Sequence, residues 1–362
     1  MNKFALIIGL GLALFPIHNK WITDLTTSDG QTSFFIPSIG ATLWIVFSLM
    51  YLAWSKHKPQ FGSKFVYIPL LVIVISMGVS GFVNGASIQD KVSPLLMGIC
   101  LFSLYLASRI LGKAIFLSLI PFIIIGVISV IVQGLLNPGQ YTGGFITNYC
   151  ASAGYLILGS ILCRGKWQWV LLLITAIGLF FIGALEAVFI VGVLAIVFII
   201  RRDYSRKFLL AIIPLAVIVI IWASLGHLIP LYEGNHNIQA LYQIITGQIP
   251  LDDKSLWDLT SGRWPVIVDA IKDWSWTGHG YSLGTATGGI VHNLPLIIMH
   301  QIGPFGAAAW LFVTIYCLIK TKWKYAFIAI LAASIWDHYI WTQFIPWFWA
   351  LVGVASVTTN SK

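Results

Sequence analysis

Charged residues are scarce in this chain, since only 9% of its 362 residues are Asp, Glu, Lys or Arg. A water-soluble domain covers its surface with much more charge, because globular proteins are on average about 25% charged. Hydrophobic residues make up 58% of the sequence instead, and its 16 Trp and 13 Tyr suit the aromatic belts that form at bilayer interfaces. The composition therefore excludes a soluble globular protein and predicts a polytopic membrane protein.

Cysteine is also rare, and the spacing of the possible metal ligands is unfavourable. The four cysteines, Cys100, Cys150, Cys163 and Cys317, all lie in or beside apolar segments and lack metal-ligand spacing, so we expect no disulfide framework. The eight histidines include no His-x-x-x-His pair, the spacing that puts two imidazoles on one face of a helix. We therefore expect no metal and no cofactor.

Apolar segments of roughly membrane-spanning length recur along the whole chain. We find them at residues 3–18, 33–54, 65–83, 92–108, 113–135, 148–163, 167–183, 184–200, 208–228, 293–319, 325–337 and 340–358. Because a helix crosses a bilayer with about 20 apolar residues, we expect an all-α protein of about 12 transmembrane helices. These helices would form a single integral membrane domain over residues 1–362.

The loop charges predict how the chain is oriented. Most of the 21 Lys and Arg residues fall in alternate loops on the side of both termini, whereas nearly all of the 12 acids fall in the other loops. Cytoplasmic loops are enriched in Lys and Arg, so we expect a bacterial inner-membrane protein with both termini in the cytoplasm. Membrane insertion also explains the net charge of +9, so we expect membrane lipids but no nucleic acid as partners.

This orientation places the longest loop, residues 229–291, in the periplasm. A loop of this length in a compact protein is usually functional. Its stretch 257–277 predicts a short amphipathic helix, with Thr260 or Ser261 as the N-cap and Pro265 in the first turn.

His292 and Asn293 follow the loop directly, where the chain returns to the membrane. Imidazole titrates near neutral pH, so His292 is suited to accept a proton from a hydroxyl nucleophile. Asn293 would orient either the imidazole or a substrate hydroxyl. The alternative is that His292 is an interfacial residue hydrogen-bonded to a neighbouring loop.

The segment after His292 has the composition of a broken helix. Pro295 and Pro304 predict a kink, which membrane helices tolerate where they line a cavity. Gly303 and Gly306 would let another helix approach closely. A second polar pair, Asp337-His338, lies on the outer side between the last two apolar segments, and we interpret it as a helix end without a role.

Arg263 is the only arginine that the loop charges assign to the outer side, in a loop that is otherwise acidic. A guanidinium is well matched to a phosphate or a diphosphate, because its planar fork donates two parallel hydrogen bonds. The alternative is a surface residue that extends toward the membrane interface. Trp264 follows it directly.

Together with other short motifs, these residues resemble the pattern of the O-antigen ligase and O-antigen polymerase superfamily. The resemblance is carried by Arg263-Trp264, Trp276-Thr-Gly-His-Gly-Tyr281, His292-Asn293-x-x-Leu296, Gly303 and Gly306. It implies an enzyme that transfers a glycan from undecaprenyl diphosphate to an acceptor sugar hydroxyl at the periplasmic face, without a nucleotide sugar or a metal and with inversion at the sugar carbon. His292 would be the base, and Arg263 would stabilise the departing diphosphate, helped by Lys272.

Two positions depart from the pattern of the superfamily. Gln301 stands where members often have an acid, nine residues after the histidine. Glu186 lies in a helix where many members have an arginine, so Lys272 or His279 would have to supply the second positive charge. An ionisable group inside a membrane helix is functional by default; the alternative for Glu186 is a satisfied acid at the interface.

The resemblance leaves the acceptor open. In a polymerase the acceptor is another lipid-linked repeat, in which case a chain-length regulator is a further partner to consider; in a ligase it is the sugar of the lipid A core. We favour an O-antigen or capsule polymerase because the outer loop is compact. A membrane transporter is the alternative from another class, but it predicts polar residues near the bilayer midplane on several helices. Away from the ends of the spans, Glu186 is the only charge within a predicted span.

Overall fold

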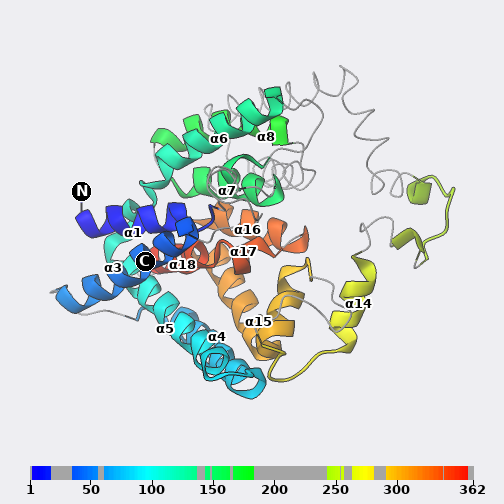
Figure 1. Ribbon diagram of the computed structural model, residues 1–362, viewed down its shortest axis with the longest axis horizontal. Coiled ribbons are helices and arrows are strands. Elements are labelled where there is room, and N and C mark those ends of the chain that lie inside the picture. Colours follow the sequence, from blue (N-terminus) through cyan, green and yellow to red (C-terminus); the bar gives the residue numbers. More distant parts are fainter. Residues whose placement is uncertain are drawn as a thin grey trace.

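The computed structural model describes residues 2–17, 35–55, 61–136, 143–146, 149–163, 166–182, 243–252, 254–256, 263–280, 291–336 and 338–357. Within these ranges the chain forms helices and connecting segments and contains no strand, so the all-α prediction is confirmed (Figure 1). The α-helices are α1 (Lys3–Leu14), α3 (Phe35–Trp54), α4 (Lys64–Asn84), α5 (Ile88–Leu111), α6 (Leu119–Leu136), α7 (Tyr149–Leu162), α8 (Lys166–Ile182), α14 (Trp264–Lys272), α15 (Leu294–Lys320), α16 (Lys324–Trp336), α17 (Tyr339–Thr342) and α18 (Ile345–Val357). Two 3₁₀ turns, η1 (Gly112–Phe116) and η2 (Gly144–Ile146), accompany them.

Each predicted apolar segment within these ranges coincides with at least one helix. The predicted spans 184–200 and 208–228, and most of the loop 229–291, lie outside the described residues. Among the described residues, four helices are long and apolar enough to cross a membrane: Lys64–Asn84, Ile88–Phe116, Leu119–Leu136 and Leu294–Lys320. Shorter apolar helices accompany them. The chain is therefore a helical membrane protein, and the count of 12 spans stays a prediction.

Large apolar side chains on these helices face outward, as a lipid environment requires. Ile75 on α4 is 60% exposed and Ile125 on α6 is 54% exposed. Water would disfavour such surfaces, whereas hydrocarbon does not.

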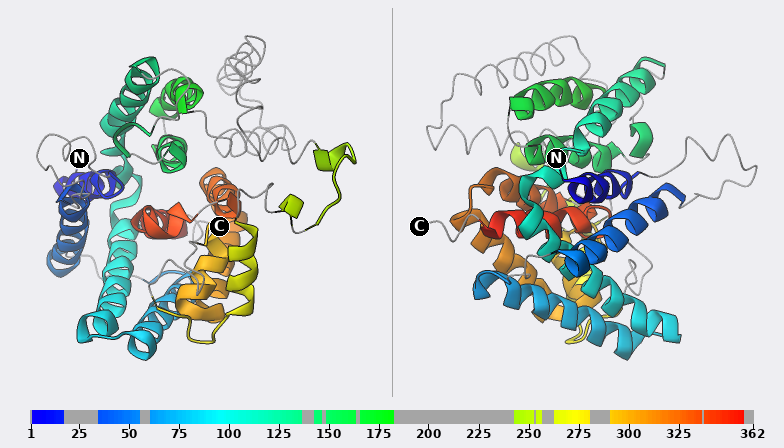
Figure 2. Two further views of the ribbon diagram at one scale, coloured as in Figure 1. Left: turned by 45° about the vertical axis from the view of Figure 1, so that its right-hand side comes forward. Right: turned by 90° about the vertical axis from the view of Figure 1, so that its left-hand side faces the viewer.

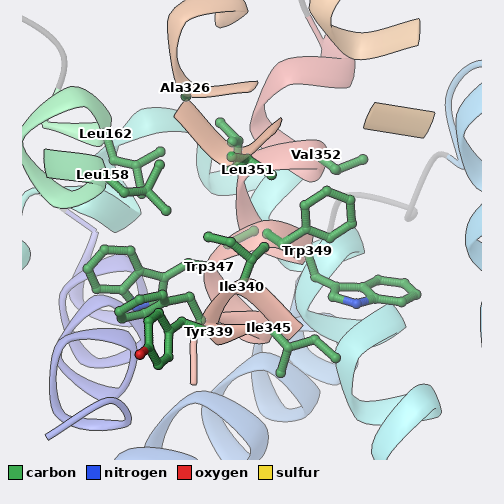
Figure 3. Packing of buried hydrophobic residues seen from close by; sticks show 14 of the residues in the cluster. Leu158, Leu162, Ala326, Tyr339, Ile340, Ile345, Trp347, Trp349, Leu351 and Val352 are labelled. Atoms are coloured by element: carbon green, nitrogen blue, oxygen red, sulfur yellow. The ribbon is translucent and has the colours of Figure 1, made fainter. Parts of the chain in front are cut away.

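Helix α18 forms the centre of the described bundle (Figures 1 and 2). Every residue from Ile345 to Ser356 is buried, so this helix has no polar face, and a helix that is apolar all round belongs inside. Figure 3 shows Trp347, Leu351 and their neighbours packed with side chains of α7, α16 and α17. The indole Nε1 of Trp347 donates to the backbone oxygen of Leu12 at 2.7 Å, which ties α18 to α1.

Helices α4, α5 and α15 position the segments discussed below. A short turn joins α4 to α5, and Ser87 begins α5 with a capping box in which its hydroxyl accepts from the backbone N–H of Asp90 at 3.1 Å. Such a box satisfies N–H groups that otherwise lack partners at a helix start. Helix α15 packs along α4, while α1 and α3 lie at the opposite side of the molecule from α14 (Figure 1).

Candidate functional site

Helix α15 is broken at Gly303, as the prolines predict. Gly303 has φ 80° and ψ 171°, and Pro304 begins the second half of the helix. Residues 273–280 follow α14 and are called the outer segment, because the loop charges predict that they lie on the outer side. Residues 276–278 of this segment lie directly against the kink. A side chain at Gly303 would collide with the backbone oxygen of Trp276, and one at Gly278 (φ 73°) would collide with that of Gln301. Glycine is needed on both sides because two backbones meet there and both φ values disfavour other residues.

The mutation Gly303→Ala should destabilise the protein strongly. The backbone conformation alone costs about 1–3 kcal/mol with a side chain present, and the collision with Trp276 adds to this cost. Thermal unfolding of the purified chain in detergent measures the effect. The matched control is Gly112→Ala, where φ is 63° but no atom lies within 4 Å of the added carbon. Equal losses in both variants would show that the contact with Trp276 is unimportant.

Hydrogen bonds hold the outer segment on α4 and α15. The backbone N–H of His279 donates to His300 O at 2.7 Å, and that of Gly280 donates to Ser80 Oγ at 3.0 Å. The Asn84 side-chain amide donates to Gly278 O at 3.1 Å. The Gly-x-Gly turn of the motif is therefore anchored at the C-terminal end of α4, a contact that spacing along the chain could not predict.

His292 immediately precedes the Asn293 cap of α15 and is half-buried. Its ring packs edge-on against that of His338, with 5.1 Å between the ring centroids, and His338 is only 9% exposed. Sequence reasoning assigned no role to His338, and the polar Asp337-His338 pair between two apolar segments is the signal that could have indicated one. The two imidazole rings are therefore in direct contact, although they are 46 positions apart in the chain.

Asn293 has a structural task. Its side-chain oxygen accepts from the backbone N–H of Leu296 at 3.2 Å and so caps α15. Its amide donates to the backbone oxygen of Ile335 on α16 at 3.3 Å. These bonds fix the start of α15 relative to α16, and thereby fix the backbone next to His292.

Arg263 occupies the N-cap position of α14 and is half-buried. The predicted amphipathic helix is present and Pro265 lies in its first turn, but the predicted N-cap was wrong: Arg263, not Thr260 or Ser261, precedes the helix, without a side-chain capping bond. Trp264 is the first helical residue and Lys272 the last, and Lys272 is exposed. Helix α14 packs beside α15 (Figure 2), so Arg263 and His292 precede neighbouring helices.

The remaining candidates are placed differently. Gln301 is 1% exposed, and its side-chain oxygen accepts from Trp341 Nε1 at 2.7 Å, so the amide is used inside the protein. Gly306 faces Ser76 of α4, in agreement with the predicted close approach of a helix. Glu186 lies outside the described residues.

Two cavities flank the docked outer segment. One of about 530 Å³ is bordered by polar residues, among them Asn84, Asp90, Ser93 and His279. The other, of about 280 Å³, is mainly apolar and is lined by residues that include Ile75, Val79, Trp276 and Phe305. We call the first the polar cavity after these side chains, although apolar residues also form much of its wall, and the second the apolar cavity.

Several contacts between distant segments lie near helix ends. The C-terminal end of α4 bonds to residues 278–280 through Ser80 and Asn84, and His292 packs against His338. Ser63 bonds to the hydroxyl of Tyr316 at 3.3 Å, and the guanidinium of Arg109 bonds to Ser356. In the predicted topology the first two contacts lie toward the outer side and the last two toward the cytoplasmic side, so each joins segments that are expected on the same side of the membrane.

No protein-family model matches this chain, and no curated protein matches it.

Proposed function

We propose that the protein is a glycosyltransferase that moves an oligosaccharide from undecaprenyl diphosphate to an acceptor sugar at the periplasmic face. An O-antigen or capsule polymerase is favoured, with an O-antigen ligase as the alternative. One observation carries the proposal: described segments that carry motif residues, far apart in the chain, pack against one another. Helix α14 lies on α15, and Gly278 meets the kink at Gly303.

The chemistry requires a base and a positive charge. His292 accepts the proton of the acceptor hydroxyl, whose oxygen attacks the sugar carbon that carries the diphosphate. The bond from that carbon to the phosphate oxygen breaks with inversion, and undecaprenyl diphosphate leaves with the electron pair. Arg263 stabilises the charge that develops on the leaving group. His338 packs against His292 and acts as a positioning residue.

The two cavities support a donor that is both lipid and sugar. The apolar cavity beside Trp276 and Phe305 suits part of a polyprenyl chain, and the polar cavity beside Asn84 and His279 suits sugar hydroxyls. We also propose 12 spans with both termini in the cytoplasm, supported by the agreement between loop charges and segment contacts.

The test is deletion of the gene in its source bacterium, followed by restoration from a plasmid. Surface polysaccharide is resolved on gels, and lipid-linked glycans are extracted and sized. We expect the deletion strain either to carry single repeats at the surface, which identifies a polymerase, or to accumulate lipid-linked polymer, which identifies a ligase. Unchanged polysaccharide and unchanged lipid-linked glycans would overturn the proposal.

A further inference from the structure

Three side chains with metal-binding atoms meet where the outer segment docks on α15. Asp273 follows α14, His279 lies in the Gly-x-Gly turn, and His300 lies in the first half of α15. One ligand atom from each residue lies within 4.8 Å of those of the other two. The His279 and His300 rings have centroids 4.7 Å apart, and His279 Nε2 lies 3.8 Å from a carboxylate oxygen of Asp273.

His300, the most buried residue of the cluster, has an unsatisfied polar atom. The residue is 2% exposed, and its Nδ1 is buried without a hydrogen-bond partner among the residues that the structure describes. A buried ring nitrogen is normally paired, and an exception calls for an explanation such as an ion or a water. Asp273 is exposed and His279 half-buried, so the cluster is open to solvent on one side.

We propose that Asp273, His279 and His300 bind one divalent transition-metal ion, with Zn²⁺ as the best match. Two imidazoles and one carboxylate are ligands that Zn²⁺ accepts, at about 2.0–2.2 Å. Tetrahedral geometry at these bond lengths places the donor atoms roughly 3.3 Å from one another. In the structure the three ligand atoms lie within 4.8 Å of one another, so small side-chain rotations bring them to the distances that the ion requires. His279 Nε2, which contacts the backbone oxygen of Asp273 at 2.5 Å, turns to the ion in this step.

The fourth coordination position stays open, as in zinc sites that bind water or a substrate oxygen. His279 also borders the polar cavity next to Asn84 and Asp90. The proposed site and that cavity therefore share His279. The ion also links α14, the outer segment and α15, in addition to the main-chain contacts at the kink and the stacking of Trp276 on Phe305.

The sequence argued against a metal because short histidine spacings are absent. That criterion detects ligands on one helix or in one loop, whereas these three residues come from a stretch between positions 273 and 300. Only the docking of the outer segment on the kink at Gly303 brings them together.

The test measures metal binding by the full chain, purified in detergent with a tag that contains no histidine and stripped with a chelator. Co²⁺ is titrated as a spectroscopic substitute, and Zn²⁺ content is measured by mass spectrometry after dialysis. We expect one ion per chain and the visible absorption of a four-coordinate Co²⁺ site. No glycan substrate is present, so the result is independent of the proposed transferase activity.

Variants assign the ligands. Asp273→Asn is the primary variant because Asp273 is exposed and its loss should not impair folding; His279→Gln is the second. Each variant should lower the affinity for Co²⁺ by at least about tenfold. Removal of a residue that only hydrogen-bonds to a metal ligand already costs about 10–100-fold, and removal of a ligand itself should cost no less. Asp269→Asn, one turn earlier on α14, and His292→Gln, in the other histidine pair, should retain full binding. A wild-type chain that binds no Co²⁺, or an Asp273→Asn variant that binds normally, would overturn the proposal.

Discussion

Replacement of His292 by Ala should abolish polymer formation while the protein remains in the membrane at its normal level. The substitution removes the base that accepts the proton of the acceptor hydroxyl. A general base accelerates a reaction by about 10²–10⁴-fold, so the transfer rate should fall by this factor. The ring is half-buried next to His338, and Asn293, not His292, provides the cap of α15. Folding should therefore survive the substitution.

The measurement is the polysaccharide ladder of the deletion strain carrying each variant, with membrane levels checked by immunoblot. His57→Ala is the matched control, because the loop charges assign His57 to the cytoplasmic side; it should give the wild-type ladder. A normal ladder from His292→Ala would remove His292 from the reaction. An intermediate ladder is expected for His338→Ala, because it changes only the position of the base.

Replacement of Arg263 by Lys should lose most of the activity although the charge is kept. A guanidinium donates two parallel hydrogen bonds to a diphosphate, whereas an ammonium acts as a point charge. Removal of one donor that stabilises developing charge costs about 10²–10³-fold in rate, so we expect Arg263→Ala to lose about this much and Arg263→Lys to recover little of it.

The same ladder assay measures this effect. Lys254→Ala is the control, because Lys254 is an exposed cation of the same outer loop with no role in the proposed reaction, and its ladder should be normal. If Arg263→Lys were fully active, the residue would serve the start of α14 rather than the diphosphate.

Local features of this fold could be predicted from the sequence, and long-range contacts could not. Apolar runs located the described membrane helices, and Pro304 located the break in α15, because both depend on residues adjacent in the chain. The docking of Trp276 on Gly303 and the contact of His292 with His338 depend on packing between distant segments. A single sequence contains no record of such pairs.

The same limit applies to Gln301. Its spacing from His292 makes it a substrate-binding candidate, and the structure shows in addition that its side-chain oxygen accepts from Trp341. Spacing gives the position of a residue along a helix, but it does not predict which distant side chain packs there. The N-cap of α14 was wrong by two or three positions, within the usual uncertainty of helix boundaries.

The central place of α18 has a consequence for biosynthesis. Trp347 bonds to Leu12 across 335 residues of chain, so α1 is synthesised long before its partner leaves the ribosome. Until α18 is synthesised, the surfaces of the earlier helices that pack against it stay exposed. Such exposed apolar surfaces favour binding by chaperones and cleavage by proteases. Truncation ahead of α18 should therefore yield a short-lived nascent product rather than a smaller stable protein.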